Sequence, residues 1–220
     1  MLRRILTLFS LIFLLGETAM ALKTIDLPKP VISGRISLEE SIARRRSERE
    51  FLDKELTPEQ ISQIMWSAQG ITDPAYGFRA APSAGALYPL TIYLVKKDGV
   101  YRYLPDGHKL IQIAEEDKRP SMVRASLGQS FINDAPLDVV IAVNFRITEA
   151  KYGARAFRYV CMEAGHVAEN IQLQAVTLGL TSVPIGAFWD DVIKSALNLP
   201  DTQDPLYILS VGYLKQTAEQ

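Results

Sequence analysis

The residues that could carry out chemistry begin with a run of cations from Arg44 to Arg49. Four guanidinium groups stand within these six residues, and they repel one another unless water or a bound anion neutralises them. The planar fork of arginine matches the oxygens of a phosphate, and Ser47 adds a hydroxyl donor. The run therefore predicts a phosphate-binding site or, with equal weight, a solvated basic turn at a helix end.

Two segments of small residues could approach a flat ligand closely. The first runs from Ala81 to Pro89 (APSAGALYP) and the second from Val183 to Phe188 (VPIGAF). Glycine and small side chains let backbone amides come near an aromatic ring or an anion. Taken alone, the first segment is more typical of a tight loop between a helix and a strand. The second, taken alone, is more typical of a buried strand.

Lys151 and Tyr152 form a third group, because lysine and tyrosine can both transfer protons when their pKa values are shifted. The alternative is a helix start with exposed cations, and in isolation the sequence favours it. The single cysteine, Cys161, lies on the apolar side of a helical pattern, which is typical of a small core residue rather than of a nucleophile.

Several functional classes are excluded by what the sequence lacks. It contains no dinucleotide-binding glycine loop, no phosphate-binding P-loop, no HExxH zinc motif and no GxSxG nucleophile motif. One cysteine and two histidines exclude an internal disulfide and leave no metal site to predict. A formal charge of −1 gives no overall electrostatic case for binding nucleic acid. With 48% hydrophobic and 22% charged residues, the composition is that of a globular domain.

The elements that must position these groups can be placed from periodicity and capping residues. Ser37 and Glu40 fit a capping box, and Thr57 followed by Pro58 fits a second helix start. The predicted helices cover residues 37–45, 57–70, 152–179 and 190–199, and the predicted strands cover residues 91–96, 100–104, 138–144 and 206–213. Because strands and helices do not alternate strictly, the pattern favours an α+β fold over a doubly wound sheet.

The longest helical segment, residues 152–179, has the most apolar surface. Its stripe includes Val160, Val167 and Ile171, and between Gly165 and Gly179 only Glu169 carries a formal charge. The pattern predicts a helix that is buried nearly all round, at the centre of a core or of an interface.

The first 21 residues have the layout of a secretory signal peptide. A basic start with Arg3 and Arg4 precedes an apolar run from Ile5 to Leu15, and the segment ends in an A-x-A pattern at Ala21. We expect cleavage after Ala21 and export, with a periplasmic location and no stable membrane insertion afterwards. The alternative is an uncleaved segment that anchors the protein, although its apolar run is shorter than the roughly 20 residues that span a bilayer.

Taken in order, these segments resemble the nitroreductase family of FMN-dependent enzymes. Within that family the chain is most similar to the SagB-type dehydrogenase branch, which includes the azoline dehydrogenases of thiazole and oxazole peptide maturation. The likeness runs from about Leu38 to Lys215. It rests on Arg45 to Phe51 (RRSEREF), Pro82 to Pro89 (PSAGALYP), Glu163 to Asn170 (EAGHVAEN), Pro184 to Phe188 (PIGAF) and Gly212 to Lys215 (GYLK).

The resemblance implies an α+β, nitroreductase-like fold with an antiparallel-centred sheet flanked by helices. It also implies a homodimer with flavin at the interface. The predicted organisation is a signal peptide at residues 1–21, an extended lead-in at 22–36, the FMN domain at 37–215 and a tail at 216–220.

The resemblance also implies roles for particular residues. Near the phosphate and ribityl chain it places Arg45, Arg46, Ser47, Arg49 and Lys215. From the partner subunit, the flavin would be contacted by Pro82, Ser83, Ala84 and Gly85. Gly186 and Ala187 would lie beside the isoalloxazine ring. Lys151 and Tyr152 match the lysine–tyrosine pair with which azoline dehydrogenases remove a proton.

The expected function is that of an exported FMN-dependent oxidoreductase. It would act by ping-pong hydride transfer through the flavin N5, to or from a small organic substrate, with NAD(P)H as a candidate electron donor. The alternatives are an azoline-type dehydrogenase that uses Lys151 and Tyr152, and a non-catalytic flavin-binding protein. No nucleic-acid partner is expected.

Overall fold

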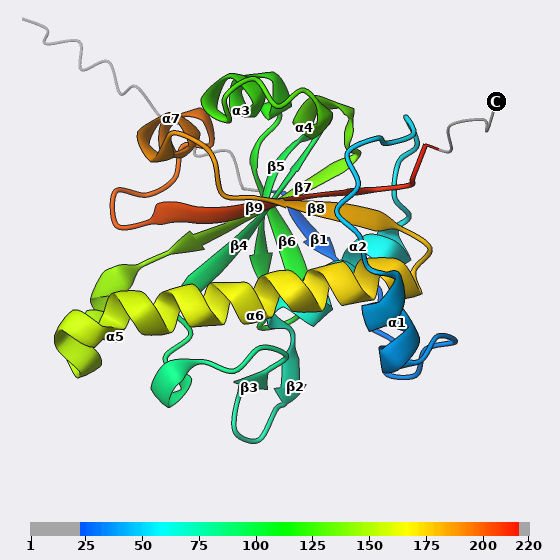
Figure 1. Cartoon of the computed structure of the whole chain (residues 1–220). Helices are drawn as coiled ribbons and strands as arrows, with labels where there is room; N and C mark the ends of the chain where they lie inside the picture. The colour runs from blue at the N-terminus through cyan, green and yellow to red at the C-terminus, as the bar shows by residue number, and fades with distance from the viewer. Residues whose placement is uncertain (1–22, 216–220) are drawn as a thin grey trace, which may run out of the picture.

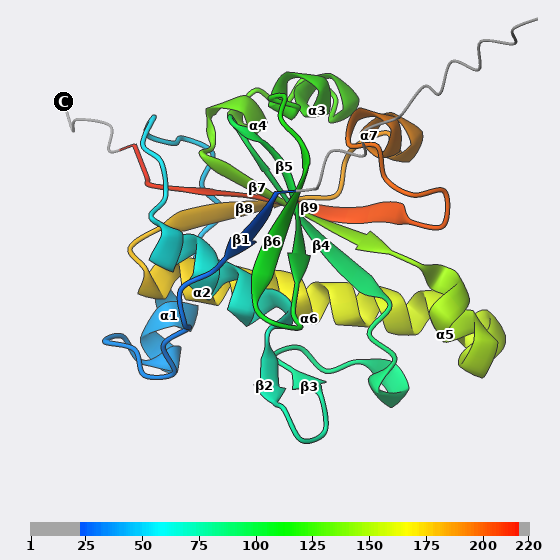
Figure 2. The ribbon, with the colours of Figure 1, turned by 180° about the vertical axis from the view of Figure 1, so that it is seen from behind.

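The computed structural model of the chain describes residues 23–215. The predicted signal peptide, residues 1–21, and the predicted tail, residues 216–220, lie outside the described residues. The described chain folds as a central sheet with helices on both faces (Figures 1 and 2). The α+β prediction is therefore confirmed.

The main sheet is antiparallel throughout. Its seven strands follow the order β1-β6-β5-β4-β7-β9-β8, so β1 and β8 form its two edges. The strands are β1 (Thr24–Asp26), β4 (Leu90–Lys96), β5 (Gly99–Leu104), β6 (Lys109–Ala114), β7 (Leu137–Val143), β8 (Thr181–Ile185) and β9 (Asp204–Gly212). A separate hairpin pairs β2 (Ile71–Asp73) with β3 (Phe78–Arg79).

Helices cover both faces of the sheet. They are α1 (Leu38–Arg44), α2 (Pro58–Gln69), α3 (Arg119–Ala125), α4 (Phe131–Asp134), α5 (Phe145–Tyr152), α6 (Ala156–Thr177) and α7 (Asp190–Ala196). In Figures 1 and 2, α2 and α6 lie on one face, whereas α3, α4 and α7 lie on the other. The β2–β3 hairpin lies beyond α6, on the side away from the sheet.

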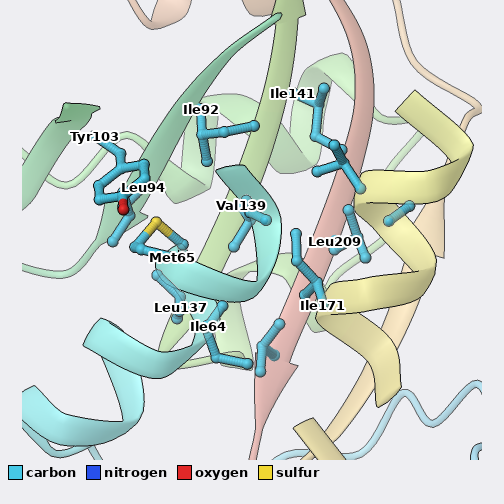
Figure 3. Packing of buried hydrophobic residues seen from close by; sticks show 14 of the residues in the cluster. Ile64, Met65, Ile92, Leu94, Tyr103, Leu137, Val139, Ile141, Ile171 and Leu209 are labelled. Atoms are coloured by element: carbon cyan, nitrogen blue, oxygen red, sulfur yellow. The ribbon is translucent and has the colours of Figure 1, made fainter. Parts of the chain in front are cut away.

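The central strand β7 is apolar at every position except Asp138. All of its residues are buried, because helices cover both faces of the sheet at this point. Val139 and Ile141 point toward α2 and α6, where they join Ile64 and Ile171 in one core cluster (Figure 3). The alternate residues, such as Val140, join a second cluster with α3, α4 and α7.

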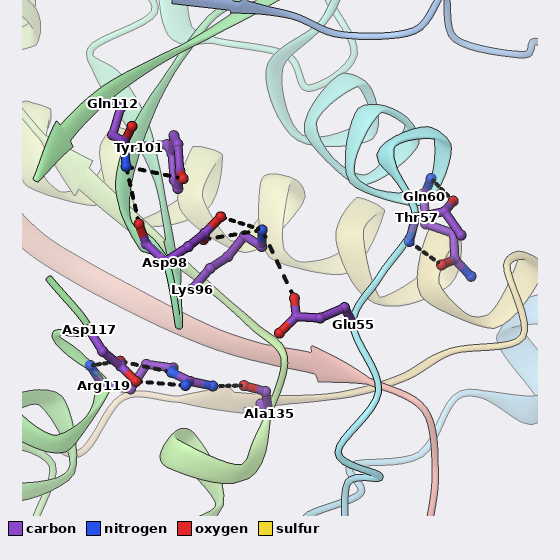
Figure 4. Close-up of polar contacts among 10 residues, drawn as sticks. All are labelled: Glu55, Thr57, Gln60, Lys96, Asp98, Tyr101, Gln112, Asp117, Arg119 and Ala135. Atoms are coloured by element: carbon purple, nitrogen blue, oxygen red, sulfur yellow. Dashed lines mark hydrogen bonds and ion pairs between the residues drawn. The ribbon is translucent and has the colours of Figure 1, made fainter. Parts of the chain in front are cut away.

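Local signals set the ends of α1 and α2 as the sequence predicts. Ser37 Oγ accepts a hydrogen bond from the Glu40 backbone N–H at 3.1 Å. Thr57 and Gln60 form a complete capping box, which Figure 4 shows, and α2 ends before Gly70. At the β4–β5 turn, Lys96 Nζ lies 3.2 Å from Asp98 Oδ1.

The long helix differs from its prediction in two ways. The predicted helix over residues 152–179 is broken, because Gly153 takes a φ of +52° and ends α5, and α6 begins only at Ala156. In this single chain, α6 is also not buried all round. Phe157 and Met162 are 64% and 54% exposed, because the rest of the described chain leaves these two positions open to solvent.

Among residues 23–215, no helix has both the length and the apolar content that crossing a membrane requires.

Candidate functional site

The cationic segment runs along the free edge of the sheet. After α1 ends, Ser47 forms a parallel bridge with Ser182 in the edge strand β8. The Glu48 backbone N–H donates to the Ser182 carbonyl oxygen at 3.2 Å. Farther along β8, Pro184 has no backbone N–H, and an edge strand tolerates such a residue. The segment is thus fixed beside one end of β8.

Two arginines of this segment have different surroundings. The Arg45 guanidinium reaches α6, where Nη1 lies 3.5 Å from Gln172 Oε1 and Nε lies 3.9 Å from Glu169 Oε1. These long contacts leave it able to bind an anion. Arg46 instead donates to the carbonyl oxygens of Ala43 and Arg45 at 3.0 and 2.7 Å, so its guanidinium satisfies the end of α1.

Arg49 and Lys215 are far apart in sequence but line the same cleft, which has a volume of about 740 Å³. The two segments are joined by an antiparallel bridge between Phe51 and Leu214. The Lys215 backbone N–H also donates to the Glu50 carbonyl oxygen at 3.0 Å. The fold therefore brings the carboxyl-terminal lysine to the cationic segment, as the site prediction requires.

One wall of this cleft contains a tight ion pair. Arg119 Nη2 lies 2.7 Å from Asp117 Oδ2, and Arg119 Nη1 donates to the Ala135 carbonyl oxygen at 3.0 Å (Figure 4). The hydrogen bond and the charge of Asp117 raise the pKa of Arg119 despite its burial. Because Arg119 is already paired, the cleft cations without an ion pair among the described residues are Arg49, Lys97 and Lys215. Acidic side chains line the same cleft, namely Glu50, Asp53, Glu55, Asp117 and Asp134.

Gly186 and Ala187 follow β8 at its other end. Both are exposed, and the Ala187 carbonyl oxygen accepts a hydrogen bond from Gln129 Nε2 at 3.1 Å. Gly186 comes four positions after Ser182 along the strand, a span of about 13 Å. The cationic segment and the small residues thus lie along one edge strand, and we call this group the edge half-site: Arg45, Ser47, Arg49, Gly186, Ala187 and Lys215.

The first small-residue segment, residues 81–89, meets the Lys151–Tyr152 pair. Gly85 has a φ of +63°, and a Cβ atom added to it would lie 2.7 Å from both Lys151 Nζ and Tyr152 Oη. The two head groups therefore converge on the backbone of Gly85, which has no side chain to keep them away. We call the second group the loop half-site: Pro82, Ser83, Ala84, Gly85, Lys151 and Tyr152.

A buried glutamate anchors the loop half-site. Ser83 Oγ donates to Glu163 Oε2 at 2.5 Å and accepts from the Tyr88 backbone N–H at 2.9 Å. Glu163 is 3% exposed, and its Oε1 has no hydrogen-bond partner among the described residues. Burial raises the pKa of Glu163 to about 7, although the Ser83 hydrogen bond and the charge of Arg79 act in the opposite direction.

Arg79 supports the same network from β3. Its Nη1 donates to Gln69 Oε1 at 3.0 Å, and its guanidinium carbon lies 4.4 Å from the centre of the Tyr88 ring. Its backbone N–H donates to Tyr88 Oη at 3.2 Å. Burial lowers the pKa of Arg79, while Tyr88 and Glu163 favour its charged form.

The sequence places Glu163 in the EAGHVAEN motif but indicates no role for its side chain. A signal was available, because Glu163 lies on the same helical stripe as Val160 and Val167. An acidic side chain on an apolar stripe must find a partner or hold a proton. Nothing in the local sequence indicates that the partner is Ser83, eighty residues earlier in the chain.

The two half-sites lie apart within one chain. The edge half-site contacts α6 through Glu169 and Gln172, and the loop half-site contacts it through Glu163. Figure 1 shows α1 and α5 at opposite ends of α6. Within residues 23–215, no hydrogen bond or ion pair joins one half-site to the other. Nor do the described residues contain a cluster of histidine, cysteine, aspartate and glutamate that could hold a metal ion.

The residues of both half-sites fit a flat cofactor that carries a phosphate, as FMN does. Arg45, Arg49 and Lys215 supply cations for a phosphate near one end of β8, and at the other end Gly186 is exposed, with Tyr207 4.0 Å from the place of an added Cβ atom. At the loop half-site, a side chain at Gly85 would meet Lys151 and Tyr152. The cations suit a phosphate and the small residues suit a flat ring, whereas the acidic side chains of the cleft oppose an anion.

Comparisons with known proteins give a single family. The sequence profile described as the nitroreductase family matches residues 42–213. A protein of Methanocaldococcus jannaschii, named as a nitroreductase, is 42% identical over 195 residues that cover 86% of this chain and 96% of that protein. The crystal structure of a protein described as a nitroreductase, from Ralstonia eutropha JMP134, superposes with a TM-score of 0.81 at 28% identity. That match covers 88% of this chain and 90% of the other.

A second relative has a more specific name. The microcin B17-processing protein McbC of Escherichia coli is 28% identical over 175 residues. The match covers 74% of this chain, which spans 64% of the length of McbC.

Proposed function

This chain belongs to the nitroreductase family, and from that premise we propose that it is an FMN-dependent oxidoreductase that acts as a homodimer. Members of this family use FMN. The observation that carries the proposal is the edge half-site, in which Arg49 and Lys215 line one cleft, Arg45 reaches α6 from the same segment, and Gly186 follows the other end of β8. When bound, FMN supplies the hydride chemistry, and the protein supplies position, charge and exclusion of water.

Each residue of the edge half-site has a proposed task. Arg45, Arg49 and Lys215 neutralise the phosphate, because charge-assisted hydrogen bonds from cations to phosphate are stronger than neutral ones. Ser47 is held against β8 and adds a hydroxyl donor, with Arg46 beside it. Gly186 and Ala187 leave the end of β8 open to an aromatic ring.

We propose that a second copy of the chain completes the site. Residues Pro82 to Gly85 lie at the other end of α6 from the edge half-site, so one chain alone does not bring both groups to one ligand. The exposed apolar side chains of α6, Phe157 and Met162, provide a face that a partner would cover. Two symmetric sites would result from one such interface.

A second candidate activity is that of an azoline-type dehydrogenase, and a specific observation favours it. Lys151 Nζ and Tyr152 Oη converge on Gly85, so an amino group and a phenolic hydroxyl stand together at the loop half-site. In this reading the group that has lost its own proton, as a neutral amine or a phenolate, accepts a proton from the substrate. The likeness to McbC, which is named as a processing protein, supports this alternative.

The experiment that tests the cofactor proposal is the absorbance spectrum of the purified protein. The native protein should show flavin bands, and the double variant Arg45→Glu/Arg49→Glu should bind FMN about 100-fold more weakly or worse, because it loses two charged hydrogen bonds. The matched control Arg35→Glu/Arg124→Glu changes the same charge outside both half-sites. Full flavin retention in a folded Arg45/Arg49 variant would contradict the site assignment.

Anaerobic titration of the yellow protein with NADH and NADPH tests the electron donor. Reduction by either nicotinamide supports an oxidoreductase that passes electrons to a small organic substrate. Reduction by dithionite alone, with no turnover of any acceptor, would instead indicate a non-catalytic flavin-binding protein.

We also propose that the protein is exported to the periplasm after cleavage following Ala21. Cell fractionation with mass spectrometry of the mature amino terminus tests this. A full-length chain in the membrane fraction would support the anchored alternative.

A further inference from the structure

We propose that Glu163 is a positioning residue that, through Ser83, holds the loop from Ser83 to Tyr88 against Lys151 and Tyr152. It touches neither member of the pair by a hydrogen bond, and acts on their geometry through the loop. The inference deepens the proposed function, and its catalytic consequence rests on that function.

The loop needs an anchor because its backbone is strained. Three of its residues have positive φ values, namely +63° at Gly85, +53° at Ala86 and +49° at Tyr88. Only glycine adopts this region freely, and Ala86 and Tyr88 are not glycine. Residues in such conformations persist where the surroundings hold them, and they gather at functional sites.

The anchor is a single hydroxyl that closes the loop. Ser83 Oγ accepts from the Tyr88 N–H, which ties the end of the loop to its start, and it donates to Glu163 Oε2 on α6. Glu163 is buried in the helix that packs on the sheet, so the loop is fastened to the rigid core. Loss of the carboxyl group would release the loop from α6 at this point.

The loop in turn determines where the pair stands. At the position that a Gly85 side chain would occupy, Lys151 Nζ and Tyr152 Oη each approach to 2.7 Å. Tyr152 is also held by an edge-to-face contact with Tyr159, at 5.1 Å between ring centres. A shift of the loop by a few tenths of an ångström would therefore move at least the flexible lysine head group.

The charged and titratable groups that face Glu163 determine how the attachment of the loop depends on pH. Arg79 approaches from β3, with Tyr88 and Tyr103 close to Arg79, and Gln69 approaches from α2. Burial raises the pKa of Glu163 to about 7, so near neutral pH both its charged and its protonated forms are populated. Ser83 donates best to the charged form, and the loop should therefore be held most firmly at alkaline pH.

The test measures the reactivity of Lys151 directly. Trace acetic anhydride is applied to the purified protein at several pH values, and acetylation of Lys151 is quantified by mass spectrometry. We expect the rate of Lys151 acetylation in Glu163→Ala to be at least threefold higher than in the native protein, because the exposed Nζ is no longer held beside the backbone of Gly85. Glu163→Gln, which keeps an acceptor, should stay within about twofold of native and lose the change in rate near pH 7.

The control is Asp138→Asn, which neutralises another buried carboxyl group that accepts from a serine, on the opposite face of the sheet. Its Lys151 acetylation should match that of the native protein. In the flavin-loaded enzyme, Glu163→Ala should lower kcat while flavin content stays unchanged.

The proposal is overturned if folded Glu163→Ala acetylates Lys151 at the native rate. If Glu163→Ala fails to fold, Ser83→Ala removes the same hydrogen bond and leaves Glu163 in place. Acetylation of Lys151 at the native rate in Ser83→Ala would also overturn the proposal. Because acetylation needs neither flavin nor substrate, a colourless protein would refute the proposed function and leave this test intact.

Discussion

At two places in the described part of this molecule, a serine hydroxyl donates to a buried carboxyl group. Ser210 donates to Asp138 at 2.5 Å between the paired strands β9 and β7, and Ser83 donates to Glu163 at 2.5 Å between a loop and α6. The first pair joins strands that backbone hydrogen bonds already join. The second holds a strained loop that lies outside the main sheet. The same bond therefore serves the core in one place and the candidate site in the other.

The two pairs also share an electrostatic property. Burial raises the pKa of Asp138 well above its ordinary value, and the Ser210 hydrogen bond and the charge of Arg119 oppose this only in part. Burial likewise raises the pKa of Glu163. Both carboxyl groups keep an oxygen without a hydrogen-bond partner among the described residues. At both sites burial favours the protonated acid and the serine hydrogen bond opposes it, and the two sites differ in what the loss of that bond would disturb.

The largest expected effect is on the pH dependence of stability. In both pairs the folded protein holds a proton that the unfolded chain has released, so the free energy of unfolding falls as pH rises through that window. For Glu163 the window runs from its ordinary value of 4.5 to about 7. Each pKa unit corresponds to about 1.4 kcal/mol.

Urea denaturation at pH 5 and pH 8 measures this fall. The double variant Asp138→Asn/Glu163→Gln should lose less stability between these pH values than the native protein. If the two proteins lose the same amount, neither carboxyl group holds a proton in the folded state.

The second prediction concerns the loss of the serine donor, which should affect the two pairs to different degrees. Ser210→Ala leaves a wholly buried carboxyl group without its hydrogen bond and should lower the free energy of unfolding by about 1–3 kcal/mol. Ser83→Ala should cost less, about 1 kcal/mol, because the loop can rearrange toward solvent. Thermal unfolding of both variants at pH 5 measures the difference. A larger loss in Ser83→Ala would show that the loop is part of the cooperative core.

A third prediction concerns Gly85. Gly85→Ala forces a side chain into a backbone region that costs other residues about 1–2 kcal/mol, and its Cβ would meet Lys151 Nζ and Tyr152 Oη. The head groups can move, so the variant should fold and lose turnover more than stability. Parallel measurements of kcat and of the unfolding midpoint check this. Unchanged kcat would separate the pair from the reaction.

The smallest expected effect concerns a half-buried base, His108, for which the pH dependence has the opposite sign. His108 Nε2 lies 2.7 Å from Ser62 Oγ, and its Nδ1 lies 2.8 Å from Tyr103 Oη. Burial lowers the pKa of His108, so its contribution to stability is present above about pH 6.5 and is lost as pH falls below that value. His108→Gln should weaken this acid dependence by less than about 1 kcal/mol, because the ring is half-exposed. Denaturation at pH 5.5 and 7.5 detects it, and an opposite sign would contradict the assignment.

Elements with strong local signals could be predicted from the sequence. The capping box at Thr57 fixed α2, and the Asp98–Gly99 turn between β-branched runs fixed the β4–β5 hairpin. The helices α3 and α4 were missed because they are short and have no side-chain cap. Arg119 of α3 instead bonds the Ala135 carbonyl oxygen just after α4, a tertiary contact with no local pattern.

In the candidate site, too, features with a local sequence signal were predictable, and features that depend on tertiary contacts were not. Charge spacing and small residues indicated the cationic segment and Gly85, because those properties are visible in a few neighbouring residues. The link from Ser83 to Glu163 spans eighty residues, and the meeting of Arg49 with Lys215 depends on strand pairing at the sheet edge. The break at Gly153 was missed because one glycine in an otherwise helical pattern does not reveal its φ.

Pro184 on the edge strand β8 has a consequence for the protein in concentrated solution. A strand from another molecule would need a continuous row of amide donors as its template, and Pro184 interrupts that row. Ser47 and Glu48 already occupy the start of this sheet edge. The strand at the opposite edge, β1, is only three residues long. Neither edge of the sheet is therefore a good template for the strand pairing that builds a fibre.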